Sequence, residues 1–436
     1  MRKSSRRGRR TAAGLAAIAV VAPLVLAGCS GDQGGPPRLT WYYNPDDGGQ
    51  VELAKRCSAA SNGRYTIETS ALPRDASSQR EQLARRLAAG DTSMDIMSLD
   101  PPFVPELANP GFLAPVPANL QKQATSDDVV EGAKIGAQWD GKVVAVPFWA
   151  NTQLLWYRKS VAEKAGLDMT KPVTWDQLID ANRKTQTHIG VQGIRGESAT
   201  VWLNAMIESG GDHIIRNPTA DVRHLDLGLA GPAGQKAAQI TSTIGKEGLG
   251  GPGITTQDEN VTLQNWEGDK GSWMVNYPFV YPSLKSSVEG GTVDKAVLDD
   301  MGWARYPRTD ADKESAPPLG GIMLGVGAHS PHPDLAYDAI SCITTPENQA
   351  YYFETNGNPA SSKKAFDDPK VREAFPMAPL IRESLDAAKP RPQTPYYNEV
   401  STAIQQNYTP LDGVNDGTAA ATADFILRVL RGEALL

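Results

Sequence analysis

The sequence predicts an α/β protein built as two lobes, each with a central, parallel-rich sheet. Three observations support this prediction. Short apolar segments alternate with segments of helical spacing through most of the chain, which is typical of parallel sheets covered by helices. The chain has 436 residues, which is too long for one simple core. Hydrophobic residues make up 40% and charged residues 21%, as in ordinary globular proteins.

The first half of the chain contributes most of the expected strands. These strands are residues 38–43, 65–70, 94–99, 143–147 and 153–157. The first is apolar (RLTWYY) and the second alternates between apolar and polar positions, as a half-buried strand does. Helices are expected at residues 48–60 and 77–89, and in the second of these Leu83 and Leu87 fall on one face.

The second half of the chain contributes mainly helices. Thr174 is expected to begin a helix as its N-cap, with Gln177 at the capping-box position. Further helices are expected at residues 201–209, 333–342, 346–354 and 418–431. Glycine-flanked apolar segments predict strands at residues 270–276 and 320–327. No internal repeat or coiled coil interrupts this order.

The first 28 residues are expected to be an export signal. A basic segment at residues 2–10 precedes an apolar run at residues 12–27, which ends in Leu-Ala-Gly before Cys29. This ending resembles the lipobox of bacterial lipoproteins, which implies a lipidated Cys29. An uncleaved signal anchor is the alternative, although the run is short for a membrane span of about 20 residues. Paired arginines leave both general secretion and twin-arginine export open, and residues 29–37 have the composition of a flexible tether.

The charge and the cysteines narrow the function classes. The net charge is −7, and it becomes −13 without the six basic residues of the leader, which argues against a nucleic-acid partner. If Cys29 is lipidated, Cys57 and Cys342 remain, and they form either a disulfide in an exported protein or two buried thiols. The five histidines are scattered, so we expect no metal site and no cofactor.

Several segments resemble one known family. They are LARRLAAGDTSMDIMSLD, PFWANTQLLWYRKSVAEKAG, TWDQLIDA, GSWMVNYP and GGIMLGVG. In this order they look like the solute-binding proteins of carbohydrate ABC importers, the maltose-binding-like group, over nearly the whole mature chain. The resemblance implies a periplasmic-binding-protein-like fold with a hinge of crossing strands, no enzymatic activity, a monomeric state and an ABC permease as partner.

The same resemblance implies the extent of each lobe. Residues 38–147 plus 318–365 would form the N-lobe, and residues 148–317 plus 366–436 the C-lobe. A ligand would bind in the cleft between them, with hinge closure around it.

A narrower resemblance concerns the ligand. The segments LPRDASSQREQLARRLAAGDTSMDIMSLD, NTQLLWYR and PMAPLIRESLDAAKPRPQTPYY are similar to the trehalose-binding lipoproteins of mycobacteria, which also carry cysteines at the positions of Cys57 and Cys342. Two features depart from that pattern: Tyr277 stands where those proteins have tryptophan, and the stretch before Gly320 is shorter. The resemblance implies a disaccharide ligand, with trehalose favoured and maltose or another α-glucoside as the alternative.

Polar residues near the ends of N-lobe strands are the first candidates for ligand binding. Asp100 directly follows a strand, where a carboxylate faces the ligand crevice of an open α/β sheet, or else it caps the next turn. Asn151 offers an amide that both donates and accepts, or it is a hinge-turn asparagine. Asn44 and Asp46 follow the first strand, or belong to a solvated turn. Gln79 matches the family pattern.

The remaining candidates come mainly from the C-lobe. Glu259 lies in a polar stretch, and its assignment rests on the family resemblance. Tyr277 is a candidate stacking platform and Trp202 a candidate sugar contact, with core packing as the alternative for both. Gly321 would allow the ligand to approach the backbone, or would form a bulge. Arg391 could bind hydroxyls with its five donors, or form a surface salt bridge.

Two other classes of function are alternatives to a binding protein. In a secreted glycoside hydrolase, Asp100 and Glu259 would act as a carboxylate pair, but no catalytic motif is recognisable in the sequence. An adhesion protein is usually repetitive or rich in strands, and this chain is neither. Hydrolysis of a disaccharide by the purified protein would distinguish the enzyme from the binding protein.

Overall fold

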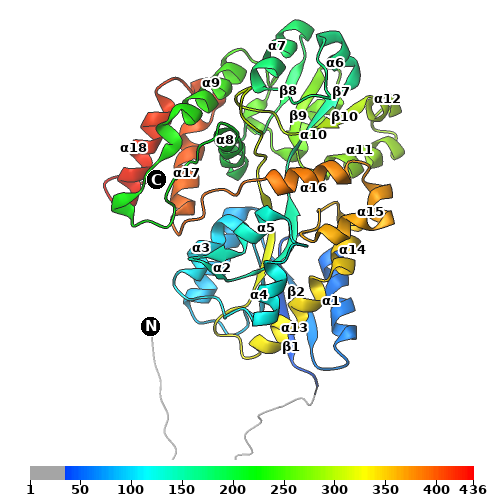
Figure 1. Cartoon of the computed structure of the whole chain (residues 1–436), viewed down its shortest axis with the longest axis vertical. Helices are drawn as coiled ribbons and strands as arrows, with labels where there is room; N and C mark the ends of the chain where they lie inside the picture. The colour runs from blue at the N-terminus through cyan, green and yellow to red at the C-terminus, as the bar shows by residue number, and fades with distance from the viewer. Residues whose placement is uncertain (1–34) are drawn as a thin grey trace, which may run out of the picture. The chain divides into compact units, whose positions relative to one another are not determined.

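The structure is a computed structural model that describes residues 35–436 (Figure 1). The expected signal peptide, the lipidation site Cys29 and most of the tether lie outside the described residues. Within residues 35–436, no helix combines the length and the apolar character that a membrane span requires.

The first sheet has five strands in the order β2-β1-β3-β11-β6. Its strands are β1 (Arg38–Tyr43), β2 (Thr66–Ala71), β3 (Ile96–Leu99), β6 (Val146–Asn151) and β11 (Gly320–Gly325). Strand β1 pairs in parallel with β2 and β3, whereas β11 runs antiparallel to both β3 and β6. Strands β3 (IMSL) and β11 (GGIMLG) are buried along their whole length, which explains why neither contains a charged residue.

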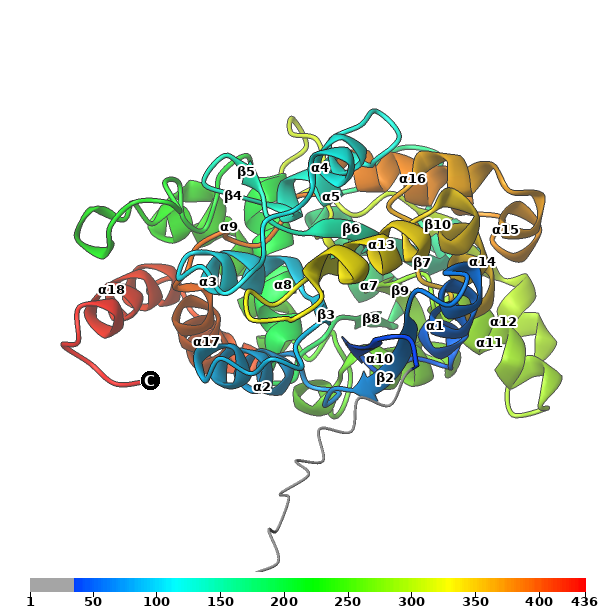
Figure 2. The ribbon, with the colours of Figure 1, turned by 90° about the horizontal axis from the view of Figure 1, so that it is seen from below.

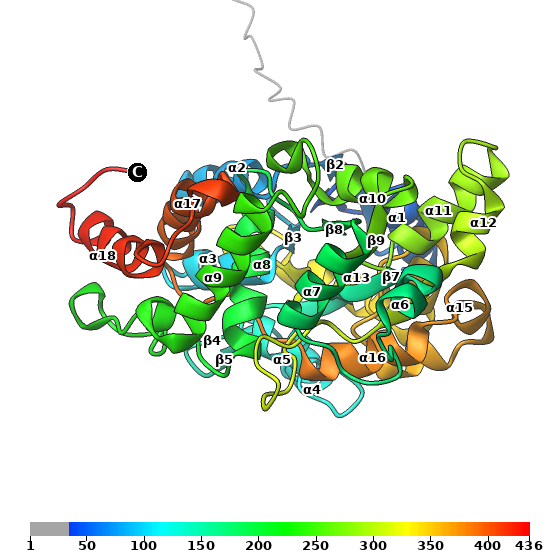
Figure 3. The same ribbon diagram turned by 90° about the horizontal axis from the view of Figure 1, so that it is seen from above.

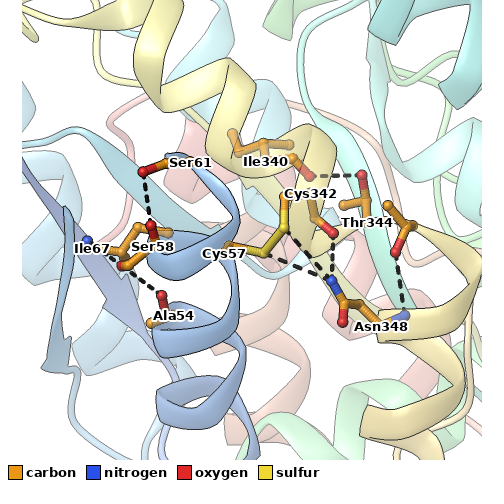
Figure 4. The surroundings of a disulfide bond; sticks show 10 residues. Ala54, Cys57, Ser58, Ser61, Ile67, Ile340, Cys342, Thr344 and Asn348 are labelled. Carbon is orange, nitrogen blue, oxygen red and sulfur yellow. Dashed lines mark hydrogen bonds between the residues drawn. A yellow bond between two sulfur atoms is a disulfide. The ribbon is translucent and has the colours of Figure 1, made fainter. Parts of the chain in front are cut away.

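Helices α1 (Gly49–Ala60), α13 (Pro333–Ile343) and α14 (Pro346–Asn356) pack against one another beside this sheet (Figure 2). A disulfide joins Cys57 of α1 to Cys342 of α13 (Figure 4). The side-chain amide of Asn348, in α14, donates to the carbonyl oxygen of Cys342 at 2.7 Å. Of the two states expected for these cysteines, the structure therefore has the bonded pair.

The second sheet has four strands in the order β10-β7-β9-β8. Its strands are β7 (Leu154–Arg158), β8 (His188–Gly190), β9 (Gly271–Asn276) and β10 (Met301–Ala304). Strand β7 is antiparallel to β9 and β10, and β8 is parallel to β9. Helices α8 (Glu197–Ser209) and α9 (Pro232–Lys246) pack together, and α7 (Trp175–Thr185) contacts α9 and β8 (Figure 3).

The α/β architecture predicted from the sequence is confirmed, and its sheets are mixed. The chain passes from β6 to β7 through only two residues, Thr152 and Gln153, and both are fully buried. Strands β6 and β11 run against their neighbours in the first sheet, so that sheet is parallel only on its β1 side. The strand expected at residues 143–147 is two strands, β5 (Lys142–Val143) and β6.

Helix boundaries follow local signals. Thr174 caps α7 by accepting from the backbone N–H of Gln177, and the side chain of Gln177 accepts from the backbone N–H of Thr174, as the capping box predicts. The remaining elements are α2 (Ala76–Ala88), α3 (Val104–Ala108), α4 (Ala118–Ala124), α5 (Glu131–Gly136), β4 (Gln138–Trp139), α6 (Lys159–Ala165), α10 (Glu259–Glu267), α11 (Val280–Glu289), α12 (Lys295–Asp299), α15 (Pro369–Ala374), α16 (Ala378–Ala387), α17 (Tyr397–Tyr408) and α18 (Thr418–Leu430).

Candidate functional site

A polar cleft of about 570 Å³ lies among segments that belong to both sheets, within the range of small-molecule sites. On the first-sheet side it is lined by Asn44, Arg74, Asp75, Ala76, Gln79, Asp100, Trp149, Asn151, Gly320, Gly321 and Ile322. On the second-sheet side it is lined by Ile194, Arg195, Gly196, Glu197, Ser198, Val201, Asp258, Glu259, Tyr277 and Arg391.

Eight of the ten residues predicted from the sequence line this cleft, and the fold explains why they meet. Three come from strand ends of the first sheet: Asn44 follows β1, Asp100 follows β3, and Asn151 ends β6. On the other side, Tyr277 follows β9. The others are Gln79, Glu259, Gly321 and Arg391. Side chains at neighbouring strand ends converge on one edge, which is where open α/β sheets bind ligands.

Arg391 is bonded to two carboxylates of the cleft. Its guanidinium donates from Nη2 to Asp100 Oδ1 at 2.6 Å and from Nη1 to Glu197 Oε1 at 2.5 Å. The Arg391 side chain is 4% exposed, so this is a buried pair rather than the surface salt bridge considered as its alternative. Asp100 follows a strand of the first sheet and Glu197 begins α8, so Arg391 connects the two sides of the cleft.

Burial controls the ionisation of the cleft carboxylates. It raises the pKa of Asp100 to about 6; Arg391 opposes the shift, and the negative charge of Glu197 adds to it. Burial also raises the pKa of Glu259, although this carboxylate accepts from Ser198 Oγ at 2.6 Å. The pKa of Tyr277 is raised by burial and by the nearby Glu259. All three groups favour their neutral forms more than they would in water.

Three buried polar atoms of the cleft lining have no hydrogen-bond partner among residues 35–436. They are Oδ1 of Asn44, Nε1 of Trp149 and Nε of Arg391. A buried polar atom without a partner costs roughly 1–3 kcal/mol, so such atoms are suited to a ligand that supplies the missing bond. Asn44 therefore offers an acceptor and Trp149 a donor.

Gly321 is required by the packing of the first sheet. Its φ is +115°, and a Cβ atom there would lie 2.3 Å from the carbonyl oxygen of Trp149. The close approach that this glycine permits is therefore to strand β6. The register of β11 against β6 shifts one residue later, between Ile322 and Met323, so the irregularity expected near this glycine is present.

The structure places two predicted site residues outside the cleft lining. The carboxylate of Asp46 accepts from the backbone N–H groups of Gly48 at 3.0 Å and Gln50 at 2.9 Å, so it satisfies donors at the start of α1. Trp202 is 2% exposed and packs edge-on against Trp175, with ring centroids 5.7 Å apart. In this structure Asp46 caps α1 and Trp202 packs in the core, and core packing is the alternative that the sequence left open for Trp202.

Other lining residues were missed by the sequence prediction. Glu197 and Ser198 follow Gly196 at the start of α8, and Arg74 and Asp75 precede α2. The glycine before a helix was the available signal for Glu197, but its partner Arg391 lies 194 residues away. Among the described residues, no group of three His, Cys, Asp or Glu side chains is placed to hold a metal ion.

Two mixed sheets joined by a buried crossing, with a polar cleft lined from both, define a two-lobed protein that binds a small solute. The sequence matches the family "Bacterial extracellular solute-binding protein" over residues 62–350, and the chain belongs to this family. The family description assigns its members to solute binding outside the cell.

Individual relatives support the same class. A probable ABC transporter-binding protein of Deinococcus radiodurans is 24% identical over 411 residues, which cover 89% of this chain and 91% of that protein. The mannitol-binding protein of Pseudomonas aeruginosa is 25% identical over 331 residues, covering 72% and 71%. The maltose-bound MalE3 of T. maritima has the same fold, with a TM-score of 0.73 and 24% identity over 91% of this chain and 100% of that one.

Proposed function

We propose that this protein is the substrate-binding component of an ABC sugar importer and binds a disaccharide, with trehalose favoured, in the cleft between its two sheets. The first sheet would belong to an N-lobe of residues 38–147 plus 318–365, extended by β6 to Asn151. The second sheet would belong to a C-lobe formed by the rest of the mature chain. The chain would act as a monomer that delivers its ligand to the transmembrane subunits of the importer.

The observation that carries this proposal is the mixture of groups in the cleft. Sugar hydroxyls need partners that donate and accept together, and the lining offers amides at Asn44 and Asn151 beside carboxylates at Asp100 and Glu259. Hydrogen bonds to charged groups contribute about 1.5–3 kcal/mol each, so a few of them reach the roughly −8 kcal/mol of micromolar binding. The ring of Tyr277 supplies an apolar surface for the C–H face of a sugar.

The charge of the cleft favours a neutral ligand. Its lining has five acidic side chains (Asp75, Asp100, Glu197, Asp258 and Glu259) and three basic ones (Arg74, Arg195 and Arg391). Two of the acidic groups are bonded to Arg391, which leaves that arginine without excess charge for an anion. We therefore expect a free sugar rather than a sugar phosphate or a uronic acid.

Trehalose is favoured by the resemblance of the sequence to trehalose-binding lipoproteins. Maltose or another α-glucoside is the second candidate, because one protein of the same fold was solved with maltose bound. A lipid on Cys29 would anchor the protein to the outer face of the cytoplasmic membrane, with the segment up to residue 37 as a tether. This would be the only contact between the described domain and the membrane.

The first test is a thermal-shift panel on leader-free protein with trehalose, maltose, sucrose and mannitol. At a hundredfold excess over its dissociation constant, a ligand stabilises the native state by about 2.7 kcal/mol, so the true ligand raises the melting temperature. We expect trehalose to give the largest shift and to remain intact during incubation. A shift with maltose alone would replace trehalose by the second candidate. Release of glucose would support a glycoside hydrolase instead.

A further inference from the structure

The carboxylate of Glu197 accepts hydrogen bonds from three protein side chains. Its Oε1 accepts from Arg391 Nη1 at 2.5 Å and from the Tyr397 hydroxyl, and its Oε2 accepts from Ser401 Oγ at 2.7 Å. The Glu197 side chain is 14% exposed. Both carboxylate oxygens are therefore engaged by protein donors, which hold the carboxylate in one orientation.

The partners of Glu197 come from two successive parts of the chain. Tyr397 and Ser401 lie one turn apart on α17, and Arg391 lies in the loop between α16 and α17. This loop runs beside the segment before β11, where the backbone N–H of Leu319 donates to the carbonyl oxygen of Lys389 at 2.9 Å. The backbone is thus fixed near Lys389, but the long Arg391 side chain depends on its partners for its direction.

Only one of the two partners of Arg391 is itself held by other side chains. Asp100 has Arg391 as its side-chain partner, whereas Glu197 is also bonded to Tyr397 and Ser401. The edge-to-face contact between Phe103 and Tyr397, with centroids 5.4 Å apart, places α17 against the segment that follows Asp100. Arg391 thus lies between two carboxylates. Glu197 is held in place by other side chains, whereas Asp100 belongs to the opposite side of the cleft and is bonded to Arg391.

We propose that Glu197 is a positioning residue, which holds the Arg391 guanidinium across the cleft so that it neutralises Asp100 and presents its remaining donors to the ligand. Arg391 Nε is buried and has no partner among residues 35–436, so a donor remains on the guanidinium. This inference rests on the proposed function for its ligand, but the placement of Arg391 is independent of which solute binds. The two can therefore be tested separately.

The decisive variant is Glu197→Gln, which keeps the size of the side chain and removes its charge. The first readout is the pKa of the Asp100 carboxyl in ligand-free protein. NMR measures this pKa in protein labelled at the aspartate carboxyl carbons, and comparison with Asp100→Asn assigns the Asp100 signal. If Glu197 positions Arg391, the guanidinium leaves Asp100 in the variant and the pKa of Asp100 rises above about 6. If Arg391 stays in place, loss of the neighbouring negative charge lowers that pKa, which overturns the proposal.

The second readout is the affinity for trehalose and maltose, measured by calorimetry. If Arg391 moves away in Glu197→Gln, its donors can no longer bind the ligand. We therefore expect the affinity of this variant for the sugar to fall at least about tenfold. A fall in affinity without a rise in the pKa of Asp100 would make Glu197 a direct ligand contact and overturn the positioning role. If neither sugar binds the wild-type protein, the proposed function fails, while the pKa readout still decides the role of Glu197.

Two milder variants test the same proposal in case Glu197→Gln does not fold. Ser401→Ala and Tyr397→Phe each remove one donor from Glu197 and leave its charge and Arg391 unchanged. Each should loosen the carboxylate and raise the pKa of Asp100 in the same direction as Glu197→Gln, but by less. No change in either variant, with both proteins folded by circular dichroism, would show that Glu197 is not held through α17 and would contradict the proposal.

Discussion

Arg391 and Asp100 form a buried ion pair 2.6 Å long, although 291 residues separate them in the sequence. Asp100 follows strand β3 of the first sheet, whereas Arg391 lies just before α17, which packs on α8 beside the second sheet. The pair therefore joins the two sides of the cleft in which we propose that the sugar binds. A buried pair of this kind specifies an arrangement of the chain more than it adds stability, because desolvation offsets much of the attraction.

The role of Asp100 in binding is tested by Asp100→Asn. This variant keeps the shape of the side chain but replaces charged hydrogen bonds by neutral ones, and it releases Arg391 from its partner. We expect the affinity for the sugar to fall about 10- to 100-fold by calorimetry. Asp46→Asn is the matched control, because Asp46 follows another strand of the first sheet, β1, but does not line the cleft. Its affinity should stay within about twofold, and an equal loss in both variants would contradict the assignment of the site.

The raised pKa of Asp100 predicts a pH dependence of stability. Its pKa is about 6 in the native state against about 4 in an unfolded chain, so the native state binds the proton more tightly. A raised pKa stabilises the fold below the unfolded value, and this contribution is lost as the pH rises through the native value. Between about pH 4 and pH 7, the unfolding free energy of the wild type should fall relative to Asp100→Asn by about 3 kcal/mol or less.

Urea unfolding of both proteins across this pH range measures the difference. Contributions from Glu259 and other titrating groups are common to the two proteins and cancel in the comparison. A difference that is constant with pH, or that changes in the opposite direction, would show that Asp100 is not the buried, raised carboxyl described above.

Removal of the disulfide should change the stability of the protein without changing its affinity for the sugar. Cys57 and Cys342 are 285 residues apart, and cross-linking over so long a loop restricts the unfolded chain strongly. We expect Cys57→Ser combined with Cys342→Ser to lower the free energy of unfolding by about 2–5 kcal/mol in urea. Neither cysteine lines the cleft, so the sugar affinity of the folded double variant should equal that of the wild type. A large loss of affinity would mean that the cleft depends on the bond.

The tight packing of β11 on β6 is tested by Gly321→Ala. The added Cβ would meet the Trp149 carbonyl oxygen at 2.3 Å in a backbone conformation with φ of +115°. Such strain costs on the order of 1–3 kcal/mol before the clash is counted, so we expect a loss of at least about 2 kcal/mol in thermal or urea unfolding. Gly413→Ala is the control, since nothing lies within 4 Å of its added Cβ, and it should change stability by less than about 0.5 kcal/mol.

Much of the fold and the site could be predicted from the sequence because their signals are local. Capping at Thr174, the apolar strand before Asp100 and the glycines of β11 each act over a few residues. Asp100 and Asn151 were identified because polar residues at strand ends converge on one edge of a sheet.

The remainder depends on contacts between distant parts of the chain. Glu197 was missed because its partners Arg391, Tyr397 and Ser401 lie about 200 residues further on. The sequence left Trp202 open between ligand contact and core packing for a similar reason: its aromatic partner Trp175 lies on another helix, and sequence spacing does not reveal which face of α8 is buried. The reversed direction of β11, which runs antiparallel to both β3 and β6, also depends on tertiary connections, and it makes the first sheet mixed.

Calorimetric titration of leader-free wild-type protein with trehalose, repeated with Asp100→Asn, tests the central claim most directly. We expect one binding site per chain with a dissociation constant in the micromolar range or below for the wild type, and binding weaker by about tenfold or more for the variant. Equal affinity in the two proteins would contradict the assignment of the site to this cleft. The absence of heat with trehalose, maltose and sucrose in the folded wild type would contradict the proposal that the cleft binds a disaccharide.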